Sequence, residues 1–154
     1  MTGRVAKVLV FATSARGLLV FEEPDFPEVG LQVPGGTVEP NESAREAAAR
    51  EFHEETGLPA PSNLTEFHTD EILPPGTPEP VRRVSFHVGL KDGLPLTWDH
   101  LERHPCDSTD PILFRFRFLP IEGAPTDLGG AQGHICAKLA TWLSGPSHPL
   151  PGDD

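Results

Sequence analysis

The sequence predicts a layered domain of the α+β or α/β class. Strand-like stretches lie on both sides of one strongly marked helix, and a second helical pattern closes the chain. A length of 154 residues with 37% hydrophobic residues suits one sizeable core. We therefore expect a single domain over residues 1–145 and a flexible, proline- and glycine-rich tail over residues 146–154.

The stretch before the central helix is dominated by short apolar runs. The first two runs are separated by a short turn and predict a hairpin, while an acidic segment with two prolines predicts a loop. In chain order we expect a strand over 4–13, a turn over 14–17, a strand over 18–21, a loop over 22–30 and a short strand over 31–33.

The second half of the chain alternates between strand patterns and irregular segments. Apolar residues recur at every second position in 81–90 and 111–120, which is typical of strands, whereas 133–143 has helical spacing. We expect a connector over 59–63, a strand over 64–73, a loop over 74–80, a strand over 81–90, an irregular segment over 91–110, a strand over 111–120 and a helix over 133–143.

The central helix, over 43–56, carries clear signals at both ends. Ser43 and Glu46 fit a capping box, and Gly57 suits the left-handed residue that ends a helix. Its predicted buried stripe consists of residues at i, i+4 and i+8, and the helix carboxylates lie mostly off that stripe. The stripe residues are Ala44, Ala48 and Phe52.

Glu51, Glu54 and Glu55 occupy positions i, i+3 and i+4 of this helix, so they share one face. Like charges at this spacing repel each other by about 0.2–0.5 kcal/mol per pair. A hard divalent cation such as Mg²⁺ reverses that repulsion, because it prefers oxygen ligands. The three glutamates are therefore candidate metal ligands, and a solvated acidic helix face is the structural alternative.

The full pattern around these glutamates resembles the signature of the Nudix hydrolase family, to which MutT-like proteins belong. The resemblance covers residues 36–58 and implies a mixed sheet sandwiched between helices, in an α/β/α arrangement. It also implies a metal ligand from the backbone carbonyl near Gly35 or Gly36. The matching residues are Gly36, Glu42, Arg50, Glu51, Phe52, Glu54, Glu55, Gly57 and Leu58.

Hydrolysis of a phosphoanhydride also needs a general base for the attacking water. Members of the family differ in which residue serves, so we take Glu54 as first choice and Glu102 as the alternative. Arg50 and Glu42 are expected to hold the ligand helix in register through a bidentate contact.

Four side chains are candidate substrate contacts. The ring of Trp98 could stack on a base, and Arg83, Arg115 and Arg117 could reach phosphate oxygens. The structural alternatives are a core position for the tryptophan and a solvated strand face for the arginines.

The composition and charge of the chain limit the classes of partner that the sequence predicts. The formal net charge of −11 argues against a nucleic-acid duplex and against an anionic membrane. Cys106 and Cys136 are too few for a disulfide framework. We find no signal peptide and no apolar run of the ~18 residues that a membrane span requires. These observations predict a cytoplasmic protein with a small-molecule partner, and a homodimer stays open.

The function that the sequence predicts is a Mg²⁺- or Mn²⁺-dependent pyrophosphohydrolase. Its expected substrate is a nucleoside diphosphate linked to another group, such as a nucleotide, a nucleotide sugar, a dinucleotide polyphosphate or a coenzyme. The alternatives are a nucleotide-binding or sensing module on the same fold and a metal-stabilised structural domain.

Overall fold

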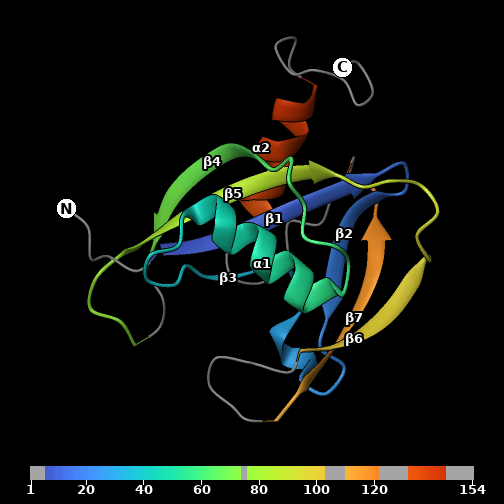
Figure 1. The fold of residues 1–154 in the computed structure, drawn as a ribbon, viewed down its shortest axis with the longest axis horizontal. Coiled ribbons are helices and arrows are strands. Elements are labelled where there is room, and N and C mark those ends of the chain that lie inside the picture. The colour runs from blue at the N-terminus through green and yellow to red at the C-terminus, as the bar shows by residue number, and fades with distance from the viewer. Residues whose placement is uncertain (1–5, 74–75, 103–109, 122–131, 145–154) are drawn as a thin grey trace. The chain divides into compact units, whose positions relative to one another are not determined.

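The computed structural model describes residues 6–73, 76–102, 110–121 and 132–144 (Figure 1). The predicted tail over 146–154 and Cys106 lie outside these residues. The chain forms two compact units, one from residues 1–11 and 33–88 and the other from residues 12–32 and 89–154. Strand β1 runs from the first unit into the second.

The described residues form strands, two α-helices and one short 3-10 helix. In chain order these are β1 (Ala6–Ser14), β2 (Gly17–Glu22), the 3-10 helix η1 (Pro27–Val29), β3 (Gly35–Thr37), α1 (Ala44–Thr56), β4 (Thr65–Ile72), β5 (Val81–Gly89), β6 (Thr97–Glu102), β7 (Ile112–Leu119) and α2 (Gly133–Leu143).

The first unit contains α1 and the strands beside it. Strand β3 pairs antiparallel with β1, with Lys7 opposite Thr37 and Leu9 opposite Gly35. Strand β5 lies between β1 and β4 in the hydrogen-bonded order, and it pairs antiparallel with β4. The pairing of β3 with β1 fixes the chain that leads into α1, because β3 has only three residues of its own. The buried apolar side chains of this unit include Val8, Val10, Phe52, Val84 and Phe86.

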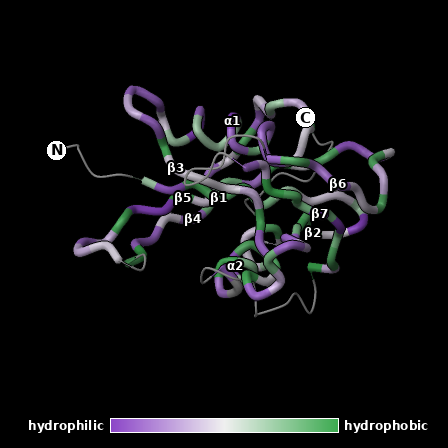
Figure 2. Tube along the Cα trace, turned by 90° about the horizontal axis from the view of Figure 1, so that it is seen from below, coloured by the Kyte–Doolittle hydropathy of each residue, from purple (hydrophilic) through white to green (hydrophobic). Residues whose placement is uncertain are grey.

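The second unit contains the strand order β1-β2-β7-β6, with β6 last, and helix α2. The β1–β2 turn brings Ser14 opposite Gly17, and both β2 and β6 pair antiparallel with β7. The rings of Phe21 and Phe114 stack with centroids 4.3 Å apart. Helix α2 is mostly apolar, and its few hydrophilic residues appear as purple segments between the green ones (Figure 2).

Most of the predicted elements are confirmed. Strands β1, β2, β4, β5 and β7 and both helices fall where the sequence patterns place them. Within the described residues, neither helix combines the length and the hydropathy that crossing a bilayer would require.

Two predictions about strands are wrong. The strand expected over 31–33 is only an isolated bridge between Phe21 and Gln32, and the strand in this region is β3, over the two glycines and Thr37. The segment over 91–110, expected to be irregular, contains β6. Strand β6 pairs along its full length with β7, and that pairing outweighs its weak local pattern.

Candidate functional site

Helix α1 begins and ends at the predicted residues. Ser43 Oγ accepts a hydrogen bond of 3.0 Å from Glu46 N, and Glu46 Oε1 accepts one of 2.9 Å from Ser43 N. Gly57 adopts a positive φ of 79° and closes the last turn. The predicted capping box and left-handed cap are therefore confirmed, and they fix the residues at which the helix begins and ends.

The prediction that the helix carboxylates lie mostly off the buried stripe is wrong. Glu51 is 7% exposed and Glu55 is 8% exposed, so both carboxylates are buried, although less completely than Phe52 at 1%. Ala48 and Phe52 are buried as expected, but Ala44 is only half-buried. Burial of two carboxylates requires compensating contacts, because an unpaired buried charge is costly.

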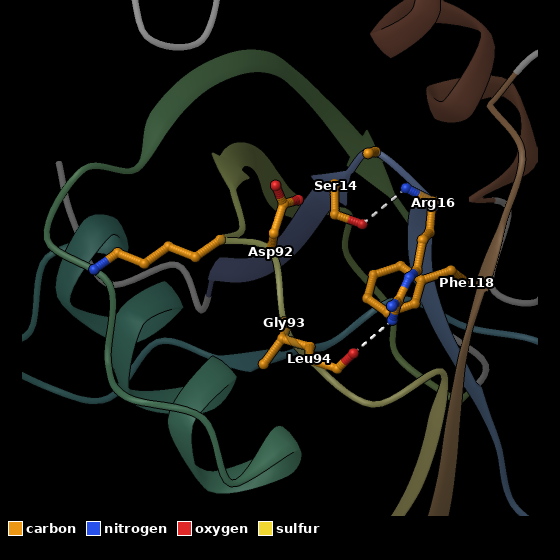
Figure 3. A pocket seen from close by; sticks show the side chains of 8 residues that line it. Ser14, Arg16, Asp92, Gly93, Leu94 and Phe118 are labelled. Carbon is orange, nitrogen blue, oxygen red and sulfur yellow. Dashed lines mark hydrogen bonds between the residues drawn. The ribbon is translucent and has the colours of Figure 1, made fainter.

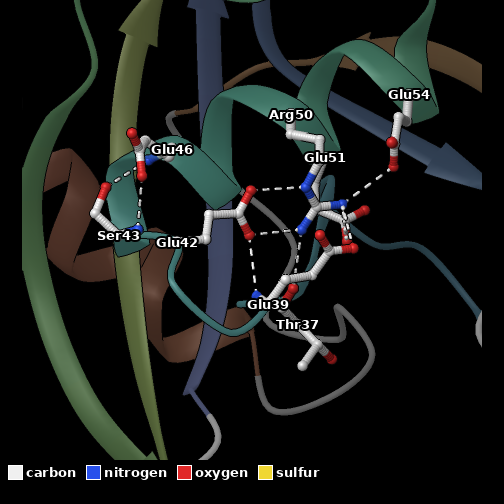
Figure 4. Close-up of polar contacts among 8 residues, drawn as sticks. All are labelled: Thr37, Glu39, Glu42, Ser43, Glu46, Arg50, Glu51 and Glu54. Atoms are coloured by element: carbon white, nitrogen blue, oxygen red, sulfur yellow. Dashed lines mark hydrogen bonds and ion pairs between the residues drawn. The ribbon is translucent and has the colours of Figure 1, made fainter.

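Arg50 lies beside Glu51 on this helix, and its shortest contacts form a fork to Glu42 (Figure 4). Its Nε donates to Glu42 Oε2 at 2.8 Å and its Nη2 to Glu42 Oε1 at 2.9 Å. The hydrogen bond from Arg50 lowers the pKa of Glu42. Arg50 Nη2 also donates to the carbonyl of Thr37 at 3.1 Å, so this one guanidinium joins α1 to β3 and to the loop between them.

The other end of the guanidinium faces the remaining carboxylates. Arg50 Nη1 lies 3.3 Å from Glu51 Oε2 and 3.3 Å from Glu54 Oε1. A carboxylate oxygen of Glu51 and one of Glu54 lie within 4.8 Å of each other, close enough to share one cation. The structure thus brings together four of the residues that the sequence singled out, namely Glu42, Arg50, Glu51 and Glu54.

The glycines of β3 lie directly beside the buried glutamates. Gly35 N donates a hydrogen bond of 3.0 Å to Glu55 Oε1. A Cβ on Gly36 would come within 2.1 Å of Glu51 Oε2, so any other residue at this position would force the Glu51 carboxylate to shift. A metal-ligating carbonyl at either glycine stays a prediction.

Arg83 lies in the first unit and is buried. Its Nε and Nη2 donate to Asp70 Oδ1 and Oδ2 at 3.1 and 3.0 Å, and its side chain is 3% exposed. Ser85 and His87, on the same face of β5, are buried as well. The Arg83 guanidinium is therefore already bound by the Asp70 carboxylate, and a substrate contact for Arg83 stays a prediction.

The other substrate candidates lie on β6 and β7 of the second unit. Trp98 stacks on Phe116, its cross-strand partner, with ring centroids 5.2 Å apart and an angle of 16° between the planes. Arg115 and Arg117 project from the other face of β7, where Asp99 Oδ1 and Oδ2 accept hydrogen bonds of 2.9 and 3.1 Å from Arg115. Trp98 and the two arginines are therefore on opposite faces. Glu102, the last residue of β6, is buried.

A small pocket of about 120 Å³ in the second unit involves none of the predicted site residues (Figure 3). Arg16 Nη1 donates to the carbonyl of Leu94 there, and Arg16 N donates to Ser14 Oγ. Its described lining is Ser14, Ala15, Arg16, Lys91, Asp92, Gly93, Leu94 and Phe118.

Sequence reasoning missed two contributors to the Arg50 contacts. Thr37 contributes its backbone carbonyl, for which side-chain patterns carry no signal. Glu39 contributes a carboxylate 3.8 Å from Arg50 Nη1, and its N–H donates to Glu42 Oε1 at 3.0 Å. Its spacing of three residues before Glu42 was the available signal, since such residues can meet in a turn.

Comparison with known proteins decides the family. A family model described as the NUDIX domain matches residues 1–135. The chain belongs to the NUDIX family. No curated protein matches it.

Solved structures of NUDIX proteins resemble the whole fold at low sequence identity. The MutT protein of Methanosarcina mazei Go1 is 18% identical, with a TM-score of 0.62 and coverage of 92% of this chain and 96% of that one. An Ap4A hydrolase of C. elegans is 18% identical, with a TM-score of 0.58 and coverage of 89% and 97%.

A third structure, the NUDIX domain of Shewanella oneidensis NrtR complexed with ADP ribose, is 12% identical, with a TM-score of 0.63 and coverage of 94% and 91%. These likenesses confirm the predicted fold class, a NUDIX α/β/α sandwich with a mixed sheet.

Proposed function

We propose that this NUDIX protein is a divalent-metal-dependent hydrolase. It cleaves the phosphoanhydride bond of a nucleoside diphosphate linked to another group, with Mg²⁺ or Mn²⁺ as cofactor. The observation that carries this proposal is the grouping of Glu51 and Glu54 around one guanidinium on a helix with the complete family signature. Membership of a hydrolase family supports it.

The donor set fits a hard cation. Carboxylate oxygens are the ligands that Mg²⁺ and Mn²⁺ prefer, and those of Glu51 and Glu54 lie within 4.8 Å of each other. Glu51, Glu54 and Glu55, with a backbone carbonyl at Gly35 or Gly36, are the residues that would hold the ion. A bound divalent cation supplies charge stabilisation to phosphate oxygens and acidifies water.

The protein's own residues then perform two tasks. Glu54, with a side chain 35% exposed, is the most accessible carboxylate of the group and takes the proton from the attacking water. The water oxygen bonds to phosphorus while the anhydride P–O bond breaks, which gives a nucleoside monophosphate and the other phosphorylated group. Glu42 and Arg50 keep the helix in register with β3 during this step. Glu102 stays the alternative base.

The substrate is a small molecule with a nucleotide moiety. The comparison proteins support this class, because one is an Ap4A hydrolase and another is a NUDIX domain complexed with ADP ribose. Trp98 is proposed to stack on the base. Arg115 and Arg117 project from the opposite face of the paired strands, so a phosphate contact from either belongs to the alternative in which Trp98 does not bind the base. A cytoplasmic location is part of the same proposal, since a soluble nucleotide is the expected substrate.

A second candidate function is a nucleotide-binding module without turnover. The complex of the Shewanella domain with ADP ribose favours it, because that domain binds a nucleotide ligand. The presence of all three signature glutamates favours hydrolysis, since a module that only binds has no need of them.

The deciding experiment is incubation of the purified protein with nucleoside triphosphates, nucleotide sugars, dinucleotide polyphosphates and dinucleotide coenzymes. Products are followed by phosphate release and chromatography, with Mg²⁺, with Mn²⁺ and with excess chelator. We expect metal-dependent monophosphate release from at least one compound. Tight binding of a compound by calorimetry, with no turnover of any, would support the binding module.

A further inference from the structure

The guanidinium of Arg50 makes two unequal sets of contacts. Toward Glu42 it forms a fork at 2.8 and 2.9 Å, within the range of strong charge-assisted hydrogen bonds. Toward Glu51 and Glu54 its Nη1 makes longer contacts, at 3.3 Å each. The Glu42 side is therefore the tighter anchor, and the contacts of Nη1 are the ones more easily broken.

The position of Nη1 matters because it lies between the two carboxylates that would share a cation. Glu51 Oε2 and Glu54 Oε1 are both its acceptors, and the side chains of both glutamates are at most partly exposed. A cation that binds these carboxylates meets a positive charge that is already at the same oxygens. Like charges so close together oppose each other strongly in a partly buried site.

We propose that Arg50 competes with the divalent cation for Glu51 and Glu54, and that metal entry releases Nη1 while the fork to Glu42 persists. The guanidinium thus weakens metal binding at the site, while the same residue holds the helix in register. This inference rests on the proposed metal-dependent function and adds a regulation of that site. Glu42 acts here as the anchor that keeps the displaced arginine nearby.

This competition gives a result opposite to that of a purely positioning arginine. If Arg50 only oriented the glutamates, its loss would weaken metal binding. If it competes, its loss removes a charge 3.3 Å from the ligand oxygens, and metal binding should tighten. The expected change is about fivefold or more, which corresponds to the interaction of about 1 kcal/mol between unit charges in water.

The test is direct titration with Mn²⁺, followed by electron paramagnetic resonance of the free ion, without substrate. Arg50→Gln removes the charge, and Arg45→Gln is the matched control. Arg45 lies on the same helix, but its guanidinium is over the ring of Phe86 at 5.5 Å and donates to the carbonyl of Leu64. Each substitution removes one positive charge, so the two variants have the same net charge.

We expect R50Q to bind Mn²⁺ more tightly than wild type, and R45Q to bind it as wild type does. Equal or weaker binding by folded R50Q overturns the competition. If neither wild type nor R50Q binds Mn²⁺, the proposed metal-dependent function fails instead. Circular dichroism and thermal melting establish that R50Q is folded.

A second measurement uses the wild-type protein alone, so the proposal stays testable if R50Q does not fold. Nitrogen-15 resonances of the Arg50 guanidinium are followed as Mg²⁺ is added. We expect the Nη1 signal to shift and its exchange with water to speed up, while Nε–H stays protected by Glu42. An unchanged Nη1 signal at saturating Mg²⁺ overturns the proposal. Faster exchange of Nε–H together with the change at Nη1 overturns it as well, because the fork to Glu42 would then be lost.

Discussion

Gly36 lies so close to Glu51 that a methyl group on its Cα would come within 2.1 Å of Glu51 Oε2. The neighbouring Gly35 donates its N–H to Glu55. The short strand β3 therefore sets the positions of two glutamates of the helix that follows it. The absence of a side chain at residue 36 is what allows the carboxylate of Glu51 to stay where it is.

We predict that Gly36→Ala displaces the Glu51 carboxylate and lowers kcat by at least about tenfold, as expected when a catalytic group is misplaced by about 1 Å. Gly89→Ala is the control, because a Cβ there meets no atom within 4 Å. Steady-state kinetics on the best substrate from the panel checks both variants. Wild-type turnover by G36A would show that Glu51 can move without cost.

We predict that Glu54→Gln lowers kcat by about 100-fold or more, because it removes a general base or a metal ligand while keeping the shape of the side chain. Glu28→Gln, an exposed position in the 3-10 helix, should leave kcat unchanged. The rate of product formation at saturating metal measures the effect. If E54Q turns over at the wild-type rate, the base lies elsewhere and Glu102 becomes the candidate.

The contact between Glu42 and Arg50 predicts a pH dependence of stability. The hydrogen bond from Arg50 lowers the pKa of Glu42 in the folded state. The ionised Glu42 carboxylate therefore contributes to the free energy of unfolding at pH values above its unfolded pKa of about 4.3. That stabilisation is lost as the pH falls through the lower, folded-state pKa. Wild type should therefore be more stable than Glu42→Gln at pH 7, and the difference should shrink in acid.

Urea unfolding of wild type and E42Q at a series of pH values from 7 to 3 measures this difference. An equal difference in the free energy of unfolding at every pH would mean that the carboxylate charge of Glu42 plays no part.

The capping box predicts a cost for Ser43→Ala of about 1 kcal/mol in the free energy of unfolding, because Glu46 N then loses its acceptor. Ser62→Ala, at an exposed position, should change it by less than about 0.5 kcal/mol. Thermal or chemical denaturation followed by circular dichroism measures both values. A neutral S43A would indicate that tertiary packing alone holds the first turn.

The sequence predicted the features of this chain that depend on local signals. The cap residues and Gly57 could be identified because they act on neighbouring backbone groups. The grouping of Glu51 and Glu54 followed from helical spacing, and the fork between Arg50 and Glu42 from the family signature.

What the sequence could not predict depends on distant residues. Strand β3 contains two glycines, which have low strand propensity, and exists because β1 pairs with it. Strand β6 was missed because the inward side of its alternation includes the polar residues His100 and Glu102 as well as Trp98. Burial of Glu51 likewise follows from its partner Arg50, which hydrophobic patterns do not reveal.

The alternation of side chains on β6 and β7 separates two candidate recognition surfaces. Trp98 lies with the phenylalanines on one face, whereas Arg115 and Arg117 lie on the other. Variant libraries can therefore randomise the aromatic side and the cationic side independently. A change in substrate binding caused by substitutions on one face then reports on that face alone.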